Sequence, residues 1–348
     1  MAEDRTSPLL SIEDLRVSFP SPAGDIYPVD GLNLHIARGE TLGLVGESGS
    51  GKSMTSLAVM GLIPRPHGKI VSGKIHFKGT NLLSLKPREM RKIRGKDISM
   101  IFQEPMTSLN PVYTIGRQIV EGIRAHGAMS GREARDRAVE MLAKVGIPGP
   151  EKRVKEYPHR LSGGMRQRVM IAMALSLNPE LLIADEPTTA LDVTIQAQIL
   201  ELMEGLKKER TMSILLITHN LGIVAESAQR VAVMYAGRIF ELAPTADLFR
   251  STLHPYTLGL LQSIPRMEGR VKQLKAIPGM VPTLDALPPG CKFSNRCFLA
   301  EDACRAAEPL LTEARPGHFV RCRRWQEVAS LTEGGKNHDR PPSGRPES

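Results

Sequence analysis

The feature that most restricts the fold of this sequence is a glycine-rich run that ends a short apolar segment at residues 41–46. An apolar segment of this length is typical of a buried parallel strand. The run matches the G-x-x-x-x-G-K-[ST] phosphate loop and consists of Gly46, Glu47, Ser48, Gly49, Ser50, Gly51, Lys52 and Ser53. Its glycines let backbone N–H groups close around a phosphate, and the helix that follows points its positive end at the anion. We therefore predict a strand, a phosphate loop and a helix, with Lys52 on the β- and γ-phosphates and the Ser53 hydroxyl on Mg²⁺.

Other apolar runs alternate with helical patterns, which predicts an α/β domain built around a mostly parallel sheet. Buried strands are predicted at 98–102, 181–184 and 213–218. A half-buried strand is predicted at 32–36, where apolar and polar residues alternate. Ser130 and Glu133 form a Ser-x-x-Glu capping box, which predicts a helix that starts there and ends near Gly146.

The composition argues against a membrane-spanning or secreted protein, but it does not identify the function. No run approaches the roughly 18 to 20 consecutive apolar residues of a membrane helix, and the polar first residues do not resemble a secretory signal, so we expect a cytosolic protein. The formal net charge is +9, from 46 Lys and Arg against 37 Asp and Glu. A basic surface suits nucleic acid, acidic lipid or nucleotide phosphates equally. Because aromatic residues are only 4% of the chain, base stacking has little support, and no nucleic-acid partner is expected.

Two carboxylates follow the apolar run at 181–184. In a phosphate-loop ATPase, Asp185 would be placed to hold Mg²⁺, usually through water. Glu186 comes one residue later, where it can polarise the water that attacks the γ-phosphate. Carboxylates at a strand end can also simply face solvent, but a phosphate loop earlier in the chain favours the catalytic interpretation.

A second phosphate-binding helix start lies at Leu161-Ser162-Gly163-Gly164-Met165, before a helix predicted over 166–177. A single nucleotide does not need two such cradles. The Leu-Ser-Gly-Gly sequence resembles the signature of the ABC ATPases. The resemblance implies that Ser162, Gly163 and Gly164 reach across a dimer to the γ-phosphate held by the phosphate loop of another subunit.

The remaining landmarks of that family occur in order. Gln103 matches the Q-loop glutamine that touches Mg²⁺ and the attacking water, and Ala190-Leu191-Asp192 matches the D-loop. His219 matches the switch histidine that contacts the γ-phosphate. Phe19 lies where the family places the aromatic side chain that stacks on adenine, with Tyr27 as the competing candidate and a core role for Phe19 as the alternative. The family fold is a phosphate-loop nucleotide-binding domain with an antiparallel β portion and a helical signature region.

Three stretches resemble one branch of the family, the importers of dipeptides, oligopeptides and nickel. They are 104–111, the signature with Met165 in place of glutamine, and His254-Pro255-Tyr256-Thr257. The signature with Met165 resembles that of the ATPase subunit called the D-type in these importers. The resemblance implies a heterodimer with a related F-type ATPase, two transmembrane permease subunits, an external solute-binding protein, and a peripheral position on the cytoplasmic face of the inner membrane. Cargo, peptide or nickel, and the import direction rest on resemblance alone.

All four cysteines, Cys291, Cys297, Cys304 and Cys322, lie in one C-terminal stretch with C-x5-C-x6-C-x17-C spacing. In a reducing cytosol such clustering favours a metal site over disulfides. The spacing itself leaves zinc, with His318 as a substitute ligand, an iron–sulfur cluster and free thiols open. Resemblance to the C-terminal region of the importers implies a 4Fe–4S cluster. We expect a structural role for it, because this appendage has too little apolar sequence to hold itself together.

We therefore predict an ABC ATP-binding domain at 9–250, a small cysteine-rich appendage at 251–332, and a disordered tail at 333–348. The predicted function is ATP hydrolysis that drives peptide uptake. The alternative is a soluble ABC ATPase that acts on ribosomes or DNA. Ribosomal relatives usually carry two ATPase domains and DNA-repair relatives carry long coiled coils, and this sequence has neither. A non-hydrolysing sensor would lack the carboxylate at Glu186.

Overall fold

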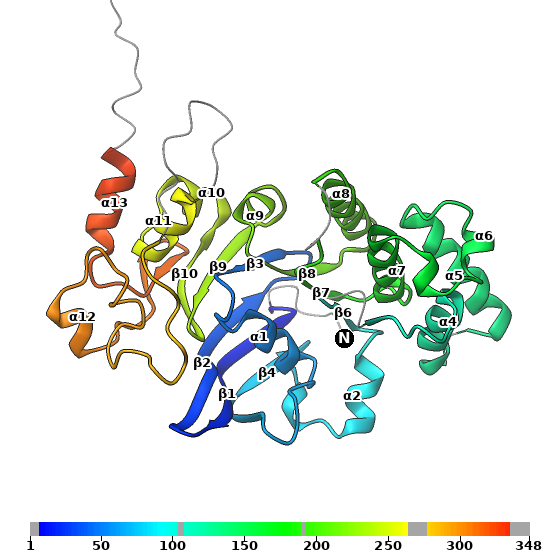
Figure 1. Ribbon diagram of the computed structural model, residues 1–348, viewed down its shortest axis with the longest axis horizontal. Helices are drawn as coiled ribbons and strands as arrows, with labels where there is room; N and C mark the ends of the chain where they lie inside the picture. The colour runs from blue at the N-terminus through cyan, green and yellow to red at the C-terminus, as the bar shows by residue number, and fades with distance from the viewer. Residues whose placement is uncertain (1–6, 104–107, 128, 189–192, 264–276, 335–348) are drawn as a thin grey trace, which may run out of the picture.

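The computed structural model describes residues 7–103, 108–127, 129–188, 193–263 and 277–334. Two sheets form its framework (Figure 1). The smaller sheet is antiparallel, in the order β2-β1-β4-β5. Its strands are β1 (Leu10–Ser21), β2 (Gly24–Ile36), β4 (Lys69–Phe77) and β5 (Thr80–Asn81). This sheet confirms the antiparallel portion predicted near the N-terminus.

The larger sheet has the order β11-β12-β10-β9-β3-β8-β7-β6. Its strands are β3 (Thr41–Val45), β6 (Ile98–Ile101), β7 (Leu181–Asp185), β8 (Ser213–Thr218), β9 (Arg230–Tyr235), β10 (Arg238–Pro244), β11 (Thr312–Arg315) and β12 (His318–Val320). Strands β9, β3, β8, β7 and β6 are parallel, and β10, β12 and β11 continue the sheet in antiparallel fashion. The mostly parallel sheet predicted from the apolar runs is confirmed.

Both faces of the parallel strands are covered, which explains why they read as continuous apolar runs. In β8, Ile214 and Leu216 belong to the core on one face, and Leu215 and Ile217 belong to the core on the other. The second of these cores also contains the apolar residues of the smaller sheet. The sheet is therefore the middle layer of the domain.

Helices complete the layers. Around the sheet lie α1 (Lys52–Val59), α2 (Pro87–Ile93), α8 (Val193–Arg210), α9 (Leu221–Ser227), α10 (Thr245–Arg250) and α11 (Pro255–Gln262). A helical region at one end of the molecule contains α4 (Ile115–Ala125), α5 (Gly131–Lys144), α6 (Pro150–Arg153) and α7 (Gly163–Leu175) (Figure 1). The predicted capping box is present, because Ser130 Oγ accepts from Glu133 N and Glu133 accepts from Ser130 N. Among the described residues, no helix combines the length and apolar character that a bilayer span requires.

The C-terminal region is built onto the larger sheet. It contains α12 (Asp302–Ala306) and α13 (Trp325–Gly334), and its strand β12 pairs with β10. Helix α13 extends two residues into the stretch predicted to be a tail, and residues 335–348 lie outside the described residues. Strand β10, which precedes the predicted boundary at residue 250, and β12, which follows it, are therefore neighbours in the same sheet.

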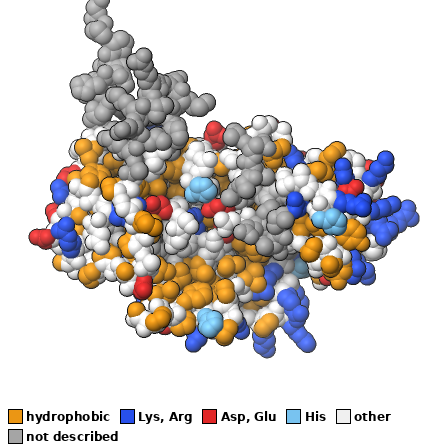
Figure 2. Space-filling model, in the orientation of Figure 1, with side chains coloured by type: hydrophobic (Ala, Val, Ile, Leu, Met, Phe, Trp, Pro, Cys, Tyr) orange, Lys and Arg blue, Asp and Glu red, His pale blue; other side chains and the backbone are white. Residues whose placement is uncertain are grey.

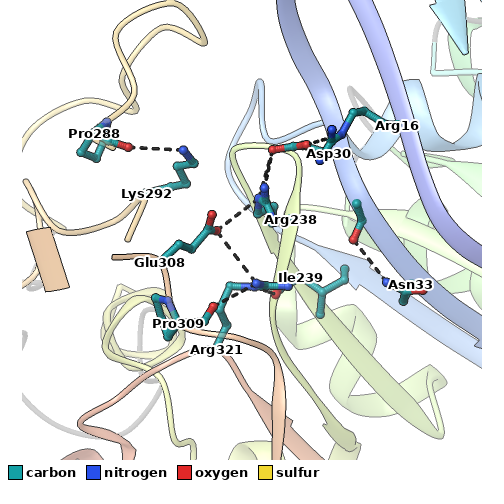
Figure 3. Close-up of polar contacts among 11 residues, drawn as sticks. Arg16, Asp30, Asn33, Arg238, Ile239, Pro288, Lys292, Glu308, Pro309 and Arg321 are labelled. Carbon is teal, nitrogen blue, oxygen red and sulfur yellow. Dashed lines mark hydrogen bonds and ion pairs between the residues drawn. The ribbon is translucent and has the colours of Figure 1, made fainter. Parts of the chain in front are cut away.

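A chain of ion pairs joins the smaller sheet to this C-terminal region (Figure 3). Asp30 on β2 pairs with Arg16 on β1 at 2.7 Å and with Arg238 on β10 at 2.7 Å. Arg238 Nε also lies 3.2 Å from Glu308. Arg321 donates to the carbonyl oxygens of Ile239 and Pro309, both at 3.0 Å.

A buried aromatic cluster makes the second connection. Tyr235 on β9 lies 4.8 Å from Tyr256 and 5.4 Å from Phe293, measured between ring centroids. The Phe240 ring lies 4.8 Å from that of His254, between centroids, with the two planes inclined at 39°. His254 Nδ1 accepts from Tyr256 N at 3.0 Å. Burial lowers the pKa of His254 to about 4, so this imidazole stays neutral in the cluster.

The low pKa of His254 predicts acid sensitivity. Its folded pKa of about 4 lies below the ordinary value of 6.5, so the unfolded state binds the extra proton as the pH falls through 6.5. Between pH 7 and pH 5, His254 should therefore remove about 2 kcal/mol from the free energy of unfolding. Urea titrations at the two pH values should show a smaller loss in His254→Gln than in the wild type. The exposed His67→Gln is the control, and an equal loss in all three proteins would contradict the assignment.

Candidate functional site

The phosphate loop connects β3 to α1, as predicted, and packs directly against other backbone. A side chain at Gly51, where φ is 105°, would place its Cβ 2.0 Å from the carbonyl oxygen of Pro28. A Cβ at Gly46 would lie 2.1 Å from the carbonyl oxygen of Met234. Real Cβ atoms do not approach oxygen so closely, so only glycine fits at either position.

Lys52 begins α1 and is buried inside the loop. Its Nζ donates to the carbonyl oxygens of Gly46 at 2.7 Å and Glu47 at 2.9 Å, and to Ser50 Oγ at 3.3 Å. Burial lowers the pKa of Lys52, and the nearby carboxylates of Glu186, Asp185 and Glu47 oppose that shift. The ammonium group therefore lies at the centre of the loop, where a phosphate would be held.

The oxygen groups predicted to hold Mg²⁺ come together beside it. Ser53 Oγ lies 3.2 Å from Asp185 Oδ1, and Ser56 Oγ donates to Asp185 Oδ2 at 3.4 Å. Burial raises the pKa of Asp185, while its hydrogen bond with Ser53 opposes that shift. A hydroxyl and a carboxylate are hard oxygen ligands of the kind Mg²⁺ takes at nucleotide phosphates, so the residues present fit the ion.

The predicted catalytic residues also converge. Gln103, just after β6, donates from Nε2 to Glu186 Oε2 at 3.2 Å. His219, just after β8, places Nδ1 3.3 Å from Glu186 Oε1. Glu186 has a φ of 47°, and its N–H donates to the carbonyl oxygen of Ile217 at 2.8 Å. Left-handed backbone at a non-glycine residue is strained and occurs preferentially at functional sites.

The signature residues begin α7, in the helical region and away from α1 (Figure 1). Ser162 is the N-cap of that helix, and its Oγ accepts from Met165 N at 3.3 Å. The two glycines that follow, Gly163 and Gly164, form the first turn. The helix predicted over 166–177 is present but begins three residues earlier, at Gly163, and ends at Leu175, because Ser162 caps it and the two glycines join its first turn. Its start lies apart from the phosphate loop.

Of the remaining predicted residues, some lie outside the described part of the chain, and the two candidates for contact with adenine lie within it. Asp192 and residues 104–107 lie outside the described part of the chain. Phe19 is half-buried on β1, with its ring tip against Gly68. Tyr27 directly precedes Pro28, and the Arg16 guanidinium lies 5.6 Å from its ring centroid. Both aromatic residues therefore stay candidates for contact with adenine.

The four cysteines of the C-terminal stretch line one cavity. All are free thiols, and burial raises the pKa of Cys291 to about 11 and that of Cys322 to about 12. His318 does not join them, because its Nε2 lies 2.7 Å from Glu241 Oε1 in a buried pair. Within the described ranges, no three Cys, His, Asp or Glu side chains are close enough together to hold a single metal ion.

Sequence reasoning missed the residues that hold Glu47. The Glu47 carboxylate pairs with Arg296, and its N–H donates to Tyr256 Oη at 2.8 Å. Tyr256 lies in the His-Pro-Tyr-Thr stretch that the sequence singled out for another reason. Arg296 had no local signal, because a single arginine beside a cysteine has no periodicity or spacing to mark it.

Comparison with known proteins agrees with this geometry. Residues 29–189 match the family described as ABC transporter, and residues 240–304 match the oligopeptide/dipeptide transporter C-terminal region. The oligopeptide transport ATP-binding protein AppD of Bacillus subtilis is 56% identical over 321 residues, which cover 92% of this chain and 98% of AppD.

Solved structures show the same fold. The dimeric post-hydrolysis structure of the ATP-binding cassette MJ0796, bound to ADP and Pi, matches with a TM-score of 0.62 and 29% identity. The match covers 68% of this chain and 98% of that one. CbiO1 from Clostridium perfringens, part of an ABC transporter complex, matches with a TM-score of 0.58 and 28% identity, over 70% of this chain and 90% of its own.

The convergence of Gln103 and His219 on Glu186 leads to a kinetic prediction. Glu186→Gln should keep the affinity for ATP but lower steady-state hydrolysis by about 10²- to 10⁴-fold, the usual contribution of a general base. Phosphate release and binding of a fluorescent ATP analogue measure the two quantities. The matched control is Glu226→Gln, which makes the same substitution at an exposed residue of α9. Turnover of Glu186→Gln near the wild-type rate would remove Glu186 as the base.

Proposed function

This chain belongs to the ABC transporter family of ATP-binding proteins, and from that membership we propose that it is the ATP-hydrolysing subunit of a peptide importer. The observation that carries the proposal is the 56% identity to AppD, an oligopeptide transport ATP-binding protein, over nearly its whole length. The match of residues 240–304 to the oligopeptide/dipeptide transporter C-terminal region supports the same cargo. Peptide is therefore favoured over nickel.

The geometry supports a specific chemistry. The N–H groups of the phosphate loop and the Lys52 ammonium bind the β- and γ-phosphates. Ser53, Asp185 and Gln103 would hold Mg²⁺, which neutralises charge on the phosphate oxygens when it is bound. Glu186 accepts a proton from water as the water oxygen bonds to the γ-phosphorus. The bond from that phosphorus to the bridging oxygen breaks, and ADP and phosphate leave.

His219 and Gln103 act around that step. Both side chains contact the Glu186 carboxylate, at 3.3 Å and 3.2 Å, and so orient it toward the attacking water. His219 is more than half exposed, with 61% of its side chain accessible, so it can turn toward the γ-phosphate of a bound nucleotide. Phe19 remains our choice for the aromatic contact with adenine, with Tyr27 as its competitor.

We propose that the signature residues complete the ATP site of a second subunit. Ser162, Gly163 and Gly164 start a helix that lies apart from α1, so they have no nucleotide to bind at their own phosphate loop (Figure 1). Asp192 belongs to the same proposed interface. The Met165 variant of the signature suggests that the partner is a related but different ATPase chain.

The proposed assembly also contains two permease subunits, to which Gln103 relays the change at the γ-phosphate, and an external solute-binding protein. The chain would then lie on the cytoplasmic face of the inner membrane. Lys and Arg side chains gather over α2 and over the far end of the helical region (Figure 2). On α2 they are Arg88, Arg91 and Lys92. Such basic surfaces are compatible with anionic lipid headgroups next to the permease.

The experiment that tests this assembly is affinity capture from detergent-solubilised native membranes. Glu186→Gln protein with ATP is the bait, because blocked hydrolysis holds the closed dimer together, and Lys52→Ala is the matched bait that should not close. Mass spectrometry should find two multi-span permease subunits and a second ATPase enriched with the first bait. Ribosomal or DNA-repair proteins without a permease would mean that the transport assignment is wrong, even if the ATPase chemistry holds.

We propose further that the cysteine cavity takes a 4Fe–4S cluster. Four thiols line one cavity, which is the ligand number such a cluster requires. Among the described residues, no three Cys, His, Asp or Glu side chains form a group that could hold a metal ion as they stand. The choice of the cluster over zinc therefore rests on the resemblance to the C-terminal region of the importers, since thiolates suit both. Cys291, Cys297, Cys304 and Cys322 would ligate it, and its role would be to stabilise the C-terminal region.

Metal analysis tests the cluster. Protein purified without oxygen should contain about four irons and four sulfides per chain. The Cys297→Ser variant should lose most of that iron, and Ser294→Ala, which also lines the cavity but removes no thiol, should keep it. Stoichiometric zinc without iron would overturn the choice of cluster, and absence of both metals would leave the thiols free.

A further inference from the structure

The second residue of the phosphate loop, Glu47, is held by an arginine 249 positions later in the chain. Arg296 Nη1 donates to Glu47 Oε2 at 2.8 Å, and Arg296 Nη2 donates to Glu47 Oε1 at 3.0 Å. The Arg296 side chain is only 5% exposed. A two-bonded fork of this kind fixes the orientation of both groups as well as their separation.

The C-terminal region and β9 hold the arginine in that orientation. Arg296 Nε donates to the carbonyl oxygen of Pro278 at 2.9 Å, and Nη2 donates to that of Gly279 at 3.2 Å. Nη1 also lies 3.4 Å from Tyr235 Oη. The pKa of Arg296 is raised above its ordinary range, chiefly by the Glu47 hydrogen bonds, so its positive charge is permanent. The guanidinium is thus positioned before any nucleotide arrives.

Glu47 is also held by its main chain. Its N–H donates to Tyr256 Oη at 2.8 Å, and its carbonyl oxygen accepts from Lys52 Nζ at 2.9 Å. Carboxylate, amide and carbonyl of one loop residue therefore have separate partners, two of which lie beyond residue 250. The loop conformation is fixed in part from the C-terminal region.

The charge of Glu47 gives this clamp a consequence for nucleotide binding. A carboxylate on a phosphate-binding loop repels the phosphates. The Glu47 carboxylate also attracts the Lys52 ammonium group and raises its pKa. The Arg296 guanidinium cancels that negative charge at hydrogen-bonding distance. If Arg296 were removed, a partly buried carboxylate would be left unpaired beside the phosphates.

We propose that Arg296 is a positioning residue of the ATP site, which holds the phosphate loop in its binding conformation and neutralises Glu47. The inference rests on the proposed ATP site. Because Arg296 precedes Cys297, which lines the cysteine cavity, the clamp also joins that cavity mechanically to the phosphate loop. The C-terminal region is then part of the nucleotide site rather than a separate module.

The test is a double-mutant cycle on Arg296 and Glu47 in the full chain, with the affinity for ATP as the quantity measured. Arg296→Gln should weaken binding of a fluorescent ATP analogue on the order of tenfold, the scale of one close charge interaction. Glu47→Gln, which leaves the Arg296 charge uncompensated beside the phosphates, is the second single variant of the cycle and should not weaken binding as Arg296→Gln does. The double variant should recover most of the lost affinity, because no unpaired carboxylate remains. Arg296→Lys, which keeps the charge and loses the fork, should lie between Arg296→Gln and the wild type.

A purely structural role predicts a different pattern. If Arg296 only braced the C-terminal region, the double variant would bind ATP no better than Arg296→Gln, and that result would overturn the proposal. Arg321→Gln is the matched control, because Arg321 is also a buried arginine beside a cavity cysteine, but it donates to Ile239 and Pro309 (Figure 3). It should lower the melting temperature without changing the ATP affinity. Equal weakening in Arg321→Gln and Arg296→Gln would also reject the proposal.

One further variant separates this inference from the ATP site itself. Lys52→Ala should abolish most ATP binding. Unchanged affinity in Lys52→Ala would reject the phosphate-loop assignment. Loss of binding in Lys52→Ala together with wild-type affinity in Arg296→Gln would reject only the role of Arg296. Thermal melting of each variant establishes that the binding data come from folded protein.

Discussion

The close approach of the phosphate loop to other backbone is the constraint on which the rest of the structure depends. Gly51 lies against the carbonyl of Pro28 from β2, and Gly46 lies against that of Met234 from β9. The loop is also tied to the turn after β9, because Gly237 N donates to Ser50 O at 2.9 Å. A side chain at either glycine would push these elements apart. The two sheets can therefore meet only around a loop without Cβ atoms at these positions.

The parallel arrangement then brings the reacting groups together. Strands β3, β8, β7 and β6 are adjacent and parallel, so their carboxyl ends share one edge of the sheet. The phosphate loop, His219, Asp185 with Glu186, and Gln103 each follow one of these ends. Ligand sites at this edge are a general property of open α/β sheets. Here the edge also places the strained Glu186 between two polar side chains that orient it.

The C-terminal region is integral to this arrangement. Strand β12 extends the sheet from β10, the aromatic cluster around Tyr235 crosses the predicted domain boundary, and Arg296 reaches the phosphate loop. A buried bidentate ion pair is costly to form unless both partners are preorganised. That cost is met here because Pro278, Gly279 and Tyr235 fix the guanidinium. The C-terminal region thus supports the nucleotide site and also contains the four cysteines.

The sequence by itself determined whatever has a local signal. Strand runs, the capping box at Ser130, the phosphate loop and the carboxylate pair after β7 were all predictable, because backbone conformation there depends on neighbouring residues. Resemblance to the family already placed Gln103, Glu186 and His219 around the γ-phosphate, and the spacing of the cysteines already suggested one site. Only the tertiary structure decided that Gln103 and His219 contact the Glu186 carboxylate directly, that Arg296 pairs with Glu47, and that His318 pairs with Glu241 instead of joining the cysteines. Such contacts depend on strand order and packing, and residues separated by tens or hundreds of positions carry no local pattern that records their proximity.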